Sequence, residues 1–256
     1  MHFGSGARIR FVGLTLALAA VAARPTAESA GPVLTRGSAS CHALALTFDL
    51  CPVQSGVGFD APLVTFLEEH RVHATFFASG KWMATHDAEL RRLIAHPFFE
   101  IGTHGQTHAH MRTLTPDAQS AEMRGAIALL EDRFGVHTQL FRPPYGEYND
   151  DTLRVAEAAG QTVVMWSVVS GDPDPKLSAS AITDDVVSRA RNGSIVIFHA
   201  NGRGWRTSEV LPAIYQRLVV AKGFGTDTIS ELRGCAGVPV TLVPDQSYSG
   251  HDGRQP

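Results

Sequence analysis

From residue 43 to residue 228 the chain alternates short apolar runs with stretches in which apolar residues recur at helical spacing. The apolar runs predict seven buried strands at 43–50, 74–79, 98–103, 138–141, 162–169, 194–198 and 224–228. The intervening stretches predict helices at 61–70, 86–95, 115–134, 150–159, 179–191 and 208–222, with a short helical turn at 229–233. Such alternation is typical of a parallel sheet covered by helices. We therefore expect an α/β fold, a distorted (β/α)7-type barrel, with an open doubly wound sheet as the alternative.

Residues at the ends of the helical stretches support these boundaries. Asp60 can cap the first helix, and Pro62 then lies in its first turn, where proline is tolerated. The run 115–117, Thr-Pro-Asp, is a strong start for the helix that follows, and Gly135 is well placed to end it.

The first 30 residues predict a secretory signal peptide. Arg8 and Arg10 precede an apolar stretch at 11–23, which is too short to span a bilayer comfortably, and small residues follow it. We therefore expect an exported protein, periplasmic or extracellular, with no stable membrane span after cleavage. An uncleaved membrane anchor is the less favoured alternative.

The composition of the chain limits its domain organisation and the kinds of partner that it can bind. The chain of 256 residues is 44% hydrophobic, enough for one large core, and we assign the folded domain to residues 41–235. Residues 236–256 carry Gly, Pro, Ser and Asp without periodicity and predict a flexible tail. The formal net charge of −3 and the scattered basic residues argue against nucleic acid as a partner.

Export would place the protein in a compartment where disulfides form. Three cysteines, Cys41, Cys51 and Cys235, follow the signal, so at most one pair can form. A bridge between Cys41 and Cys235 would join the two ends of the repeating core. A bridge from Cys51 would instead shape the region beside Asp49, and the spacing leaves both pairings open.

Polar residues of catalytic type follow the predicted strands at the points where the apolar runs end. In a parallel barrel these carboxyl ends meet at one rim, where such folds build active sites. The residues are Asp49, Cys51, His104, His108, Arg142, Tyr145, Ser170, Asp172 and His199. Their shared position favours an enzyme.

His104 and His108 have the i, i+4 spacing that would put both imidazoles on one face of a helical turn, a good grip on zinc. With twelve His in the chain, chance pairs of this spacing are expected. The alternative is a His-rich polar loop, but the position directly after a strand favours metal ligands.

The other rim residues suggest acid–base chemistry. Asp49 either caps the following loop or acts as a general base, and Arg142 either lies at the surface or holds that base ionised. Two prolines stiffen the backbone before Tyr145, whose N–H then suits a developing oxyanion. His199, which follows a core strand, is either a structural residue or a general acid oriented by Asp172. The alternative role of Asp172 is to stabilise a turn.

Five motifs occur in the order TFD (47–49), GTHGQTH (102–108), RPPYG (142–146), WSVVSGD (166–172) and IFH (197–199). Together they resemble the polysaccharide deacetylases with the NodB homology domain, carbohydrate esterase family four, over residues 43–232. The resemblance implies a distorted barrel of the glycoside hydrolase/deacetylase superfamily. It also implies removal of N- or O-acetyl groups from chitin-like chains, peptidoglycan or xylan, usually with zinc or a similar divalent ion.

The resemblance implies roles for the acid–base residues. Asp49 corresponds to the catalytic base, which Arg142 steadies. The Tyr145 N–H would contribute to the oxyanion hole. His199 corresponds to the general acid, tuned by Asp172.

The resemblance also implies a metal site and a substrate pocket. His104 and His108 correspond to metal ligands. Ile197 would line the pocket for the acetyl group, and Trp166, which opens the fourth motif, is assigned to the same pocket.

The chain departs from the family pattern at the metal site. The family's first motif continues with a second Asp, a metal ligand, and then Gly, where this chain has Leu50 and Cys51. Leucine cannot bind metal, so the protein ligands are reduced to two His, with water, Cys51 or Asp60 as candidates for another. In the fourth motif Val169 and Pro173 replace an Asp and a Trp.

These observations predict an exported hydrolase that deacetylates a polysaccharide by metal-assisted attack of water. The expected substrate is an N-acetyl amino sugar in peptidoglycan, a chitin-like chain or an exopolysaccharide, and an O-acetyl ester is also compatible. One alternative is a degenerate barrel that only binds polysaccharide or a partner. The other is a hydrolase of a non-sugar amide or ester.

Overall fold

A computed structural model describes residues 1–2, 33–54 and 56–235. The expected tail, and all but the first two residues of the expected signal peptide, lie outside the described residues. Within the described part of the chain, no helix combines the length and the hydropathy needed to cross a membrane.

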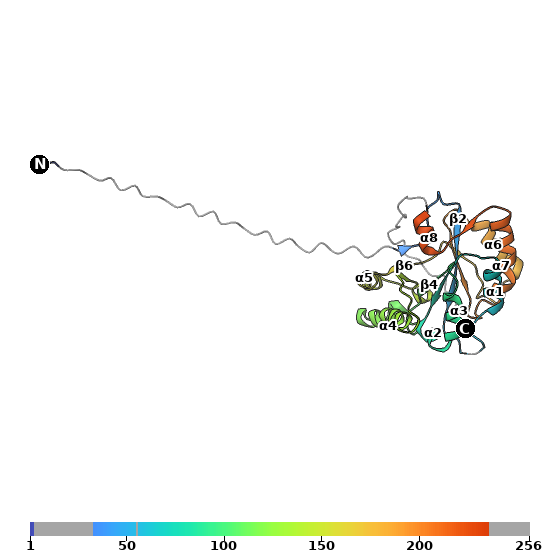
Figure 1. Ribbon diagram of the computed structural model, residues 1–256, viewed down its shortest axis with the longest axis horizontal. Helices are drawn as coiled ribbons and strands as arrows, with labels where there is room; N and C mark the ends of the chain where they lie inside the picture. Colours follow the sequence, from blue (N-terminus) through green and yellow to red (C-terminus); the bar gives the residue numbers. More distant parts are fainter. Residues whose placement is uncertain (3–32, 55, 236–256) are drawn as a thin grey trace.

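The described chain alternates strands and helices (Figure 1). The strands are β1 (Val33–Leu34), β2 (Ala43–Leu50), β3 (Ala74–Ala78), β4 (Phe99–Thr103), β5 (Leu140–Phe141), β6 (Thr162–Val164), β7 (Val168–Val169), β8 (Ile195–His199) and β9 (Gly225–Thr226). The α-helices are α1 (Ala61–Glu69), α2 (Gly80–Thr85), α3 (Asp87–Ile94), α4 (Pro116–Phe134), α5 (Asp150–Ala158), α6 (Ala179–Arg189), α7 (Thr207–Tyr215) and α8 (Ile229–Gly234). Single turns of 3₁₀-helix lie at Met111–Thr113 and Pro144–Gly146, and a π-helix at Gln216–Val220 continues α7.

The strand order shows a curled barrel. Neighbouring strands follow the order β1-β6-β5-β4-β3-β2-β8-β7, with β9 beside β2, and every strand pair is parallel. From β2 to β6 each strand pairs with the next one along the chain, and β8 returns to β2. The order is cyclic, with one gap between β6 and β7, whereas a doubly wound sheet reverses direction at a switch point. The distorted (β/α)7-type barrel is therefore confirmed, and the open sheet is wrong.

One predicted strand is wrong, because the gap between β6 and β7 divides it. The apolar run 162–169 is two strands, of which β6 pairs with β5 and β7 pairs with β8, at opposite ends of the order. Residues 165–167 connect them, and the four Cα–Cα steps from Val164 to Val168 reach at most about 14 Å, so the two ends of the sheet must curl towards each other. An apolar run reveals burial and does not reveal which neighbour a strand pairs with.

The N-terminal segment of the domain lies in this gap, which the apolar pattern did not foresee. β1 pairs with β6, and Arg36 forms an antiparallel bridge with Ser194 just before β8. The N–H of Gly37 donates to the carbonyl of Gly193 at 2.8 Å. The segment therefore links the two sides of the barrel at the amino ends of the strands.

Most helix boundaries follow the expected capping chemistry. The side chain of Asp60 accepts from the Leu63 N–H and caps α1, and Thr115 caps α4 in the same way. Gly135 ends α4 in the left-handed conformation, with φ of 70°. The short helix α2 was not expected, because it follows β3 directly and is too short to display a helical period.

Side-chain alternation along β2 sorts its residues between two environments. Leu46, Phe48 and Leu50 are buried in the core beneath the helices, where the Phe48 ring stacks on Phe198 at 5.6 Å. Ala43 and Ala45 belong to a separate cluster on the other face. Because successive side chains of a strand point to opposite faces, Asp49 shares the face of Ala45, inside the barrel.

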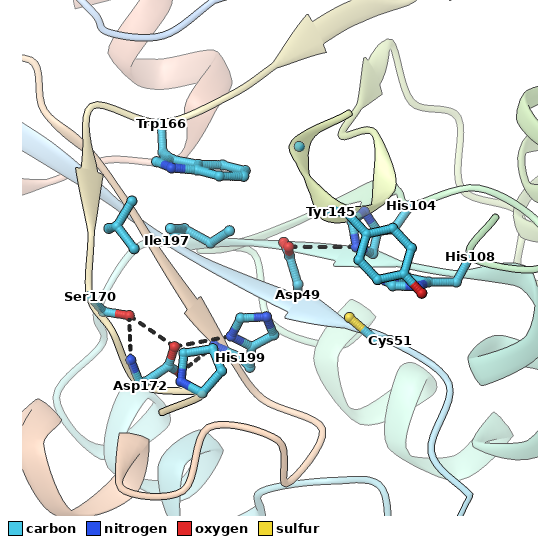
Figure 2. Close-up of a pocket in the computed structure, with 13 residues that line it drawn as sticks. Asp49, Cys51, His104, His108, Tyr145, Trp166, Ser170, Asp172, Ile197 and His199 are labelled. Carbon is cyan, nitrogen blue, oxygen red and sulfur yellow. Dashed lines mark hydrogen bonds and ion pairs between the residues drawn. The ribbon is translucent and has the colours of Figure 1, made fainter. Parts of the chain in front are cut away.

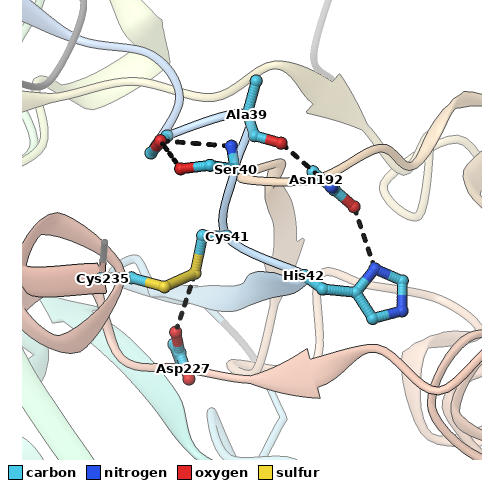
Figure 3. Close-up of a disulfide and its surroundings, with 8 residues drawn as sticks. Ala39, Ser40, Cys41, His42, Asn192, Asp227 and Cys235 are labelled. Atoms are coloured by element: carbon cyan, nitrogen blue, oxygen red, sulfur yellow. Dashed lines mark hydrogen bonds between the residues drawn. A yellow bond between two sulfur atoms is a disulfide. The ribbon is translucent and has the colours of Figure 1, made fainter. Parts of the chain in front are cut away.

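A disulfide joins Cys41, before β2, to Cys235, after α8 (Figure 3). This settles the pairing that the sequence left open. Cys51 is a buried free thiol. The bridge spans 194 positions of sequence and ties together the two ends of the repeating core.

We predict that Cys41→Ser lowers the free energy of unfolding by about 2–4 kcal/mol, because the bridge restricts the unfolded chain. Denaturant titration of the wild type and the variant measures this change. A reducing agent should destabilise the wild type to the level of Cys41→Ser and leave the variant unchanged. An equal effect of the reducing agent on both proteins would contradict the prediction.

Candidate active site

The polar residues expected at the rim do meet around one pocket of about 150 Å³ (Figure 2). It opens at the carboxyl ends of the strands. Its lining includes Asp49, Cys51, His104, His108, Tyr145, Trp166, Ser170, Asp172, Ile197 and His199. Arg142 lies behind the lining and is completely buried.

Asp49, the penultimate residue of β2, forms a buried ion pair. Its Oδ1 accepts from Nη1 of Arg142 at 2.8 Å, and its Oδ2 lies 3.5 Å from Nε2 of His104. Burial alone would raise the pKa of Asp49. The positive charge of Arg142, together with His104 and His199, outweighs burial and holds the pKa of Asp49 below its usual value.

Backbone carbonyls at the end of β6 help to hold Arg142 in place. Its Nε donates to the carbonyl of Val164 at 3.3 Å and its Nη2 to that of Met165 at 3.4 Å. Its guanidinium also lies 4.0 Å from the centre of the Phe77 ring. The end of β6 thus supplies backbone carbonyls that satisfy a buried cation.

His104 and His108 come together in a loop after β4, so the helical turn expected from their spacing is wrong. Gly105 and His108 both take the left-handed conformation, with φ of 71° and 65°. This folds the loop back and brings the two imidazole centres to 4.8 Å. A spacing of four residues does not distinguish a helical turn from a tight loop with two left-handed residues.

The two imidazoles have the properties of metal ligands. Nδ1 of His104 bonds the carbonyl of Arg142 at 2.7 Å, which leaves Nε2 facing the pocket, the arrangement that orients a ligating His. His108 makes no side-chain hydrogen bond to any described residue. Burial lowers the pKa of His104, and it lowers the pKa of His108 to about 3, so both are neutral donors. These residues therefore fit a divalent metal.

Asp172 and His199 form a second polar pair on the opposite wall. Nδ1 of His199 lies 3.0 Å from Oδ1 of Asp172, and the His199 N–H donates to Oδ2 at 2.7 Å. Ser170 donates to Oδ1 at 2.9 Å and Thr207 to Oδ2 at 2.7 Å. Burial opposes protonation of His199, but the Asp172 charge outweighs it and raises the pKa of His199 above its usual value.

Thr207 is a site residue that the strand-end argument missed. It is buried at the start of α7, eight positions after the end of β8. Gly204 lies against the same group, because a Cβ there would come within 2.4 Å of Asp172 Oδ2. Neither residue follows a strand directly, and no feature of the local sequence indicates them.

Tyr145 lies in a strained turn, with its ring between those of His108 and His110, at 4.5 Å and 4.0 Å between ring centres. Its φ is 60°, a left-handed conformation that costs a non-glycine residue roughly 1–2 kcal/mol. Among the described residues the Tyr145 N–H has no hydrogen-bond acceptor, whereas the next two N–H groups bond to Pro143 and Pro144. A strained backbone with a free donor beside a pocket suits anion stabilisation.

Trp166 and Ile197 line the apolar part of the pocket, as the sequence assigned them. Val169, which replaces an Asp of the family motif, lines the same part. Trp166 and Ile197 lie on the side of the pocket away from His104 and His108 (Figure 2).

The residues after Asp49 divide between core and pocket. Leu50 is completely buried in the core beneath the helices, so this position does not face the imidazoles. Asp60 serves as the cap of α1 and is not among the residues that line the pocket. Cys51 does line the pocket, where burial and the Asp49 charge raise the pKa of its thiol well above the usual value.

Comparison with known proteins identifies relatives. A family model described as polysaccharide deacetylase matches residues 36–164, about half of the chain. The uncharacterized protein YlxY of Bacillus subtilis is 29% identical over 170 residues, 66% of this chain and 51% of that protein. The chain thus spans about half the length of this relative. A chitooligosaccharide deacetylase of Rhizobium leguminosarum is 34% identical over 162 residues, 61% of this chain and 67% of that protein.

A solved structure shares the fold. It is a family-four carbohydrate esterase pseudoenzyme from Bacillus anthracis, with a TM-score of 0.71 and 24% identity, covering 78% of this chain and 68% of that one. The family model and the 34% identical relative also match this chain in amino-acid sequence. The protein therefore belongs to the polysaccharide deacetylase family, carbohydrate esterase family four.

Proposed function

We propose that this protein is a hydrolase that removes the acetyl group from an N-acetyl amino sugar of a polysaccharide. One observation carries the proposal. Asp49 and His199 are register partners at the ends of the adjacent strands β2 and β8, and both face one pocket. Arg142 lowers the pKa of Asp49, which favours the ionised carboxylate, and Asp172 raises the pKa of His199, which favours its protonated form. A base and an acid on the two sides of a pocket are what amide hydrolysis requires.

The proposed reaction begins with a water molecule beside Asp49. The carboxylate accepts a proton from this water as the water attacks the acetyl carbonyl. The ion pair with Arg142 keeps Asp49 ionised and oriented for this transfer. The methyl group of the acetyl would pack against Trp166 and Ile197, whose apolar surface excludes further water.

The attack places negative charge on the former carbonyl oxygen, and the free N–H of Tyr145 is available to stabilise it. A divalent metal held by His104 and His108 would polarise the carbonyl and acidify the attacking water when bound. His199 then donates its proton to the leaving nitrogen. This donation matters for an amide, because an unprotonated amine anion is a very poor leaving group.

We also propose that the protein acts outside the cytoplasm. The expected signal peptide motivates this, and the disulfide between Cys41 and Cys235 supports it, because such bonds persist in oxidising compartments. The substrate would then be an exported or surface polysaccharide. The deacetylase from Rhizobium leguminosarum supports an amino-sugar substrate.

A specific observation favours a second candidate, a barrel that binds polysaccharide without cleaving it. Leu50 occupies the position of an expected metal ligand and is buried in the core, and a structural neighbour is described as a pseudoenzyme. The retained acid and base argue against this candidate. A protein that binds N-acetylglucosamine oligomers and releases no acetate with any added divalent metal would favour it.

We predict that the purified protein releases acetate from N-acetylglucosamine oligomers and that chelation abolishes the release. Asp49→Asn and His199→Ala should each reduce turnover about 10²- to 10⁴-fold, the usual contribution of a general base or acid. Asp174→Asn is a matched control, because this exposed carboxylate lies in the loop of Asp172 but does not line the pocket. Wild-type turnover in either site variant would remove that residue from the mechanism.

The raised pKa of His199 predicts the alkaline side of the pH profile. A general acid must carry its proton, and the Asp172 charge lets His199 keep it to higher pH than an ordinary histidine. Asp172→Asn removes that charge, so the alkaline limb of kcat/KM should move to lower pH. A pH profile of acetate release measures the shift. Asp174→Asn should leave the limb in place, and an unmoved limb in Asp172→Asn would exclude His199 as the titrating acid.

A further inference from the structure

We propose that Cys51 Sγ is the third protein ligand of the metal site, which makes it a Cys–His–His site that selects zinc or a similarly thiophilic ion. This proposal depends on the proposed function only because both assign His104 and His108 as metal ligands. The family pattern has an Asp at position 50 for this role, whereas here the side chain that faces the imidazoles belongs to the following residue.

The spacing of the donor atoms carries the proposal. The sulfur of Cys51 and one ring nitrogen from each of His104 and His108 all lie within 4.8 Å of one another. Tetrahedral zinc, with bonds of about 2.0 Å to nitrogen and about 2.3 Å to sulfur, needs donors roughly 3.4–3.6 Å apart. Closing at most about 1.4 Å lies within the reach of side-chain rotation. Figure 2 shows the sulfur on the pocket side of Cys51, near Asp49 and the two imidazoles.

The backbone of Cys51 is fixed from both sides. The carbonyl of Leu50 accepts from the N–H and the hydroxyl of Ser79 at the end of β3. The carbonyl of Cys51 accepts from the buried side chain of Asn201 at 2.8 Å. Cys51 therefore continues the alternation of β2, on the inner face that it shares with Asp49.

A second observation points to a ligand between these groups. His108 is only 9% exposed, and its ring makes no hydrogen bond to any residue that the structure describes. The ring nitrogens of His108 therefore have hydrogen-bonding capacity that the described residues leave unused, in a pocket shared with a thiol and a second imidazole. Cys51 is also free for this role, because the disulfide consumes the other two cysteines.

The chemistry of these donor atoms indicates which metal ion the site prefers. A thiol binds metal as a thiolate, so its proton passes to solvent as the sulfur–metal bond forms. Thiolate and imidazole donors suit zinc, whereas magnesium, calcium and manganese prefer oxygen. Catalytic zinc sites that combine Cys and His ligands and leave one position open are known, so a thiolate is compatible with hydrolytic chemistry.

Cobalt(II) substitution tests the assignment on the full chain. Metal-free protein titrated with Co²⁺ should bind one equivalent and develop the near-ultraviolet absorption of thiolate-to-cobalt charge transfer. Because the other two cysteines are paired, this band can come only from Cys51. Cys51→Ser should lose the band and weaken zinc binding by at least about 100-fold, since losing even an outer-shell partner costs 10- to 100-fold.

Two further variants serve as controls. His108→Ala should weaken cobalt and zinc binding as strongly as Cys51→Ser does. His110→Ala should change neither the band nor the affinity, because this exposed residue of the same loop pairs with Glu147 outside the cluster. Where a variant fails to fold, X-ray absorption of the wild-type zinc protein decides, with one sulfur expected at about 2.3 Å.

The possible outcomes separate this proposal from the proposed function. Stoichiometric metal that depends on His108, with no charge-transfer band and no sulfur shell, overturns Cys51 as a ligand and leaves deacetylation possible. A protein that binds no metal also overturns it, and Cys51 is then a buried packing residue. A thiolate-bound metal in a protein that releases no acetate supports Cys51 and overturns the proposed function.

Discussion

The ion pair between Asp49 and Arg142 is the interaction on which the rest of the site depends. Both groups are buried, and a buried charge without a partner costs several kcal/mol. Arg142 meets this cost through its bond to Asp49, through the carbonyls of Val164 and Met165, and through the face of the Phe77 ring. Those carbonyls lie at the end of β6, beside the residues that follow β5. The buried guanidinium thus ties the end of β5 to the end of β6.

Arg142 also orients one of the two histidines of the expected metal site. The carbonyl of Arg142 accepts from His104 and fixes which ring nitrogen faces the pocket. Asp49 is meanwhile held with its second oxygen 3.5 Å from that nitrogen. On the far wall Asp172 holds His199 through bonds to both its ring and its backbone. Two neighbouring strand ends therefore carry groups whose pKa values are driven in opposite directions, which lets a base and an acid coexist in one pocket.

Much of this arrangement could be predicted from the sequence, because strands, caps and rim positions are local properties. Apolar runs located β2, β3, β4 and β8 to within a residue or two, and the polar residues at their ends do meet. The split of the run 162–169 and the position of Thr207 could not be predicted, since both depend on partners distant in the chain. The loop shape of His104–His108 was missed for another reason. It depends on left-handed backbone at His108, a conformation that histidine rarely adopts and that the spacing does not reveal.

The exchange of Asp-Gly for Leu50-Cys51 is consistent with the charges of the pocket. Asp49 is paired with Arg142, and Asp172 is engaged by His199, Ser170 and Thr207, so each carboxylate already has its partners. A divalent ion on two neutral imidazoles would then have no anionic ligand. One thiolate from Cys51 supplies the same single charge as the carboxylate of the family pattern. It leaves the site positive overall, which favours the oxyanion that forms when water attacks an acetyl carbonyl.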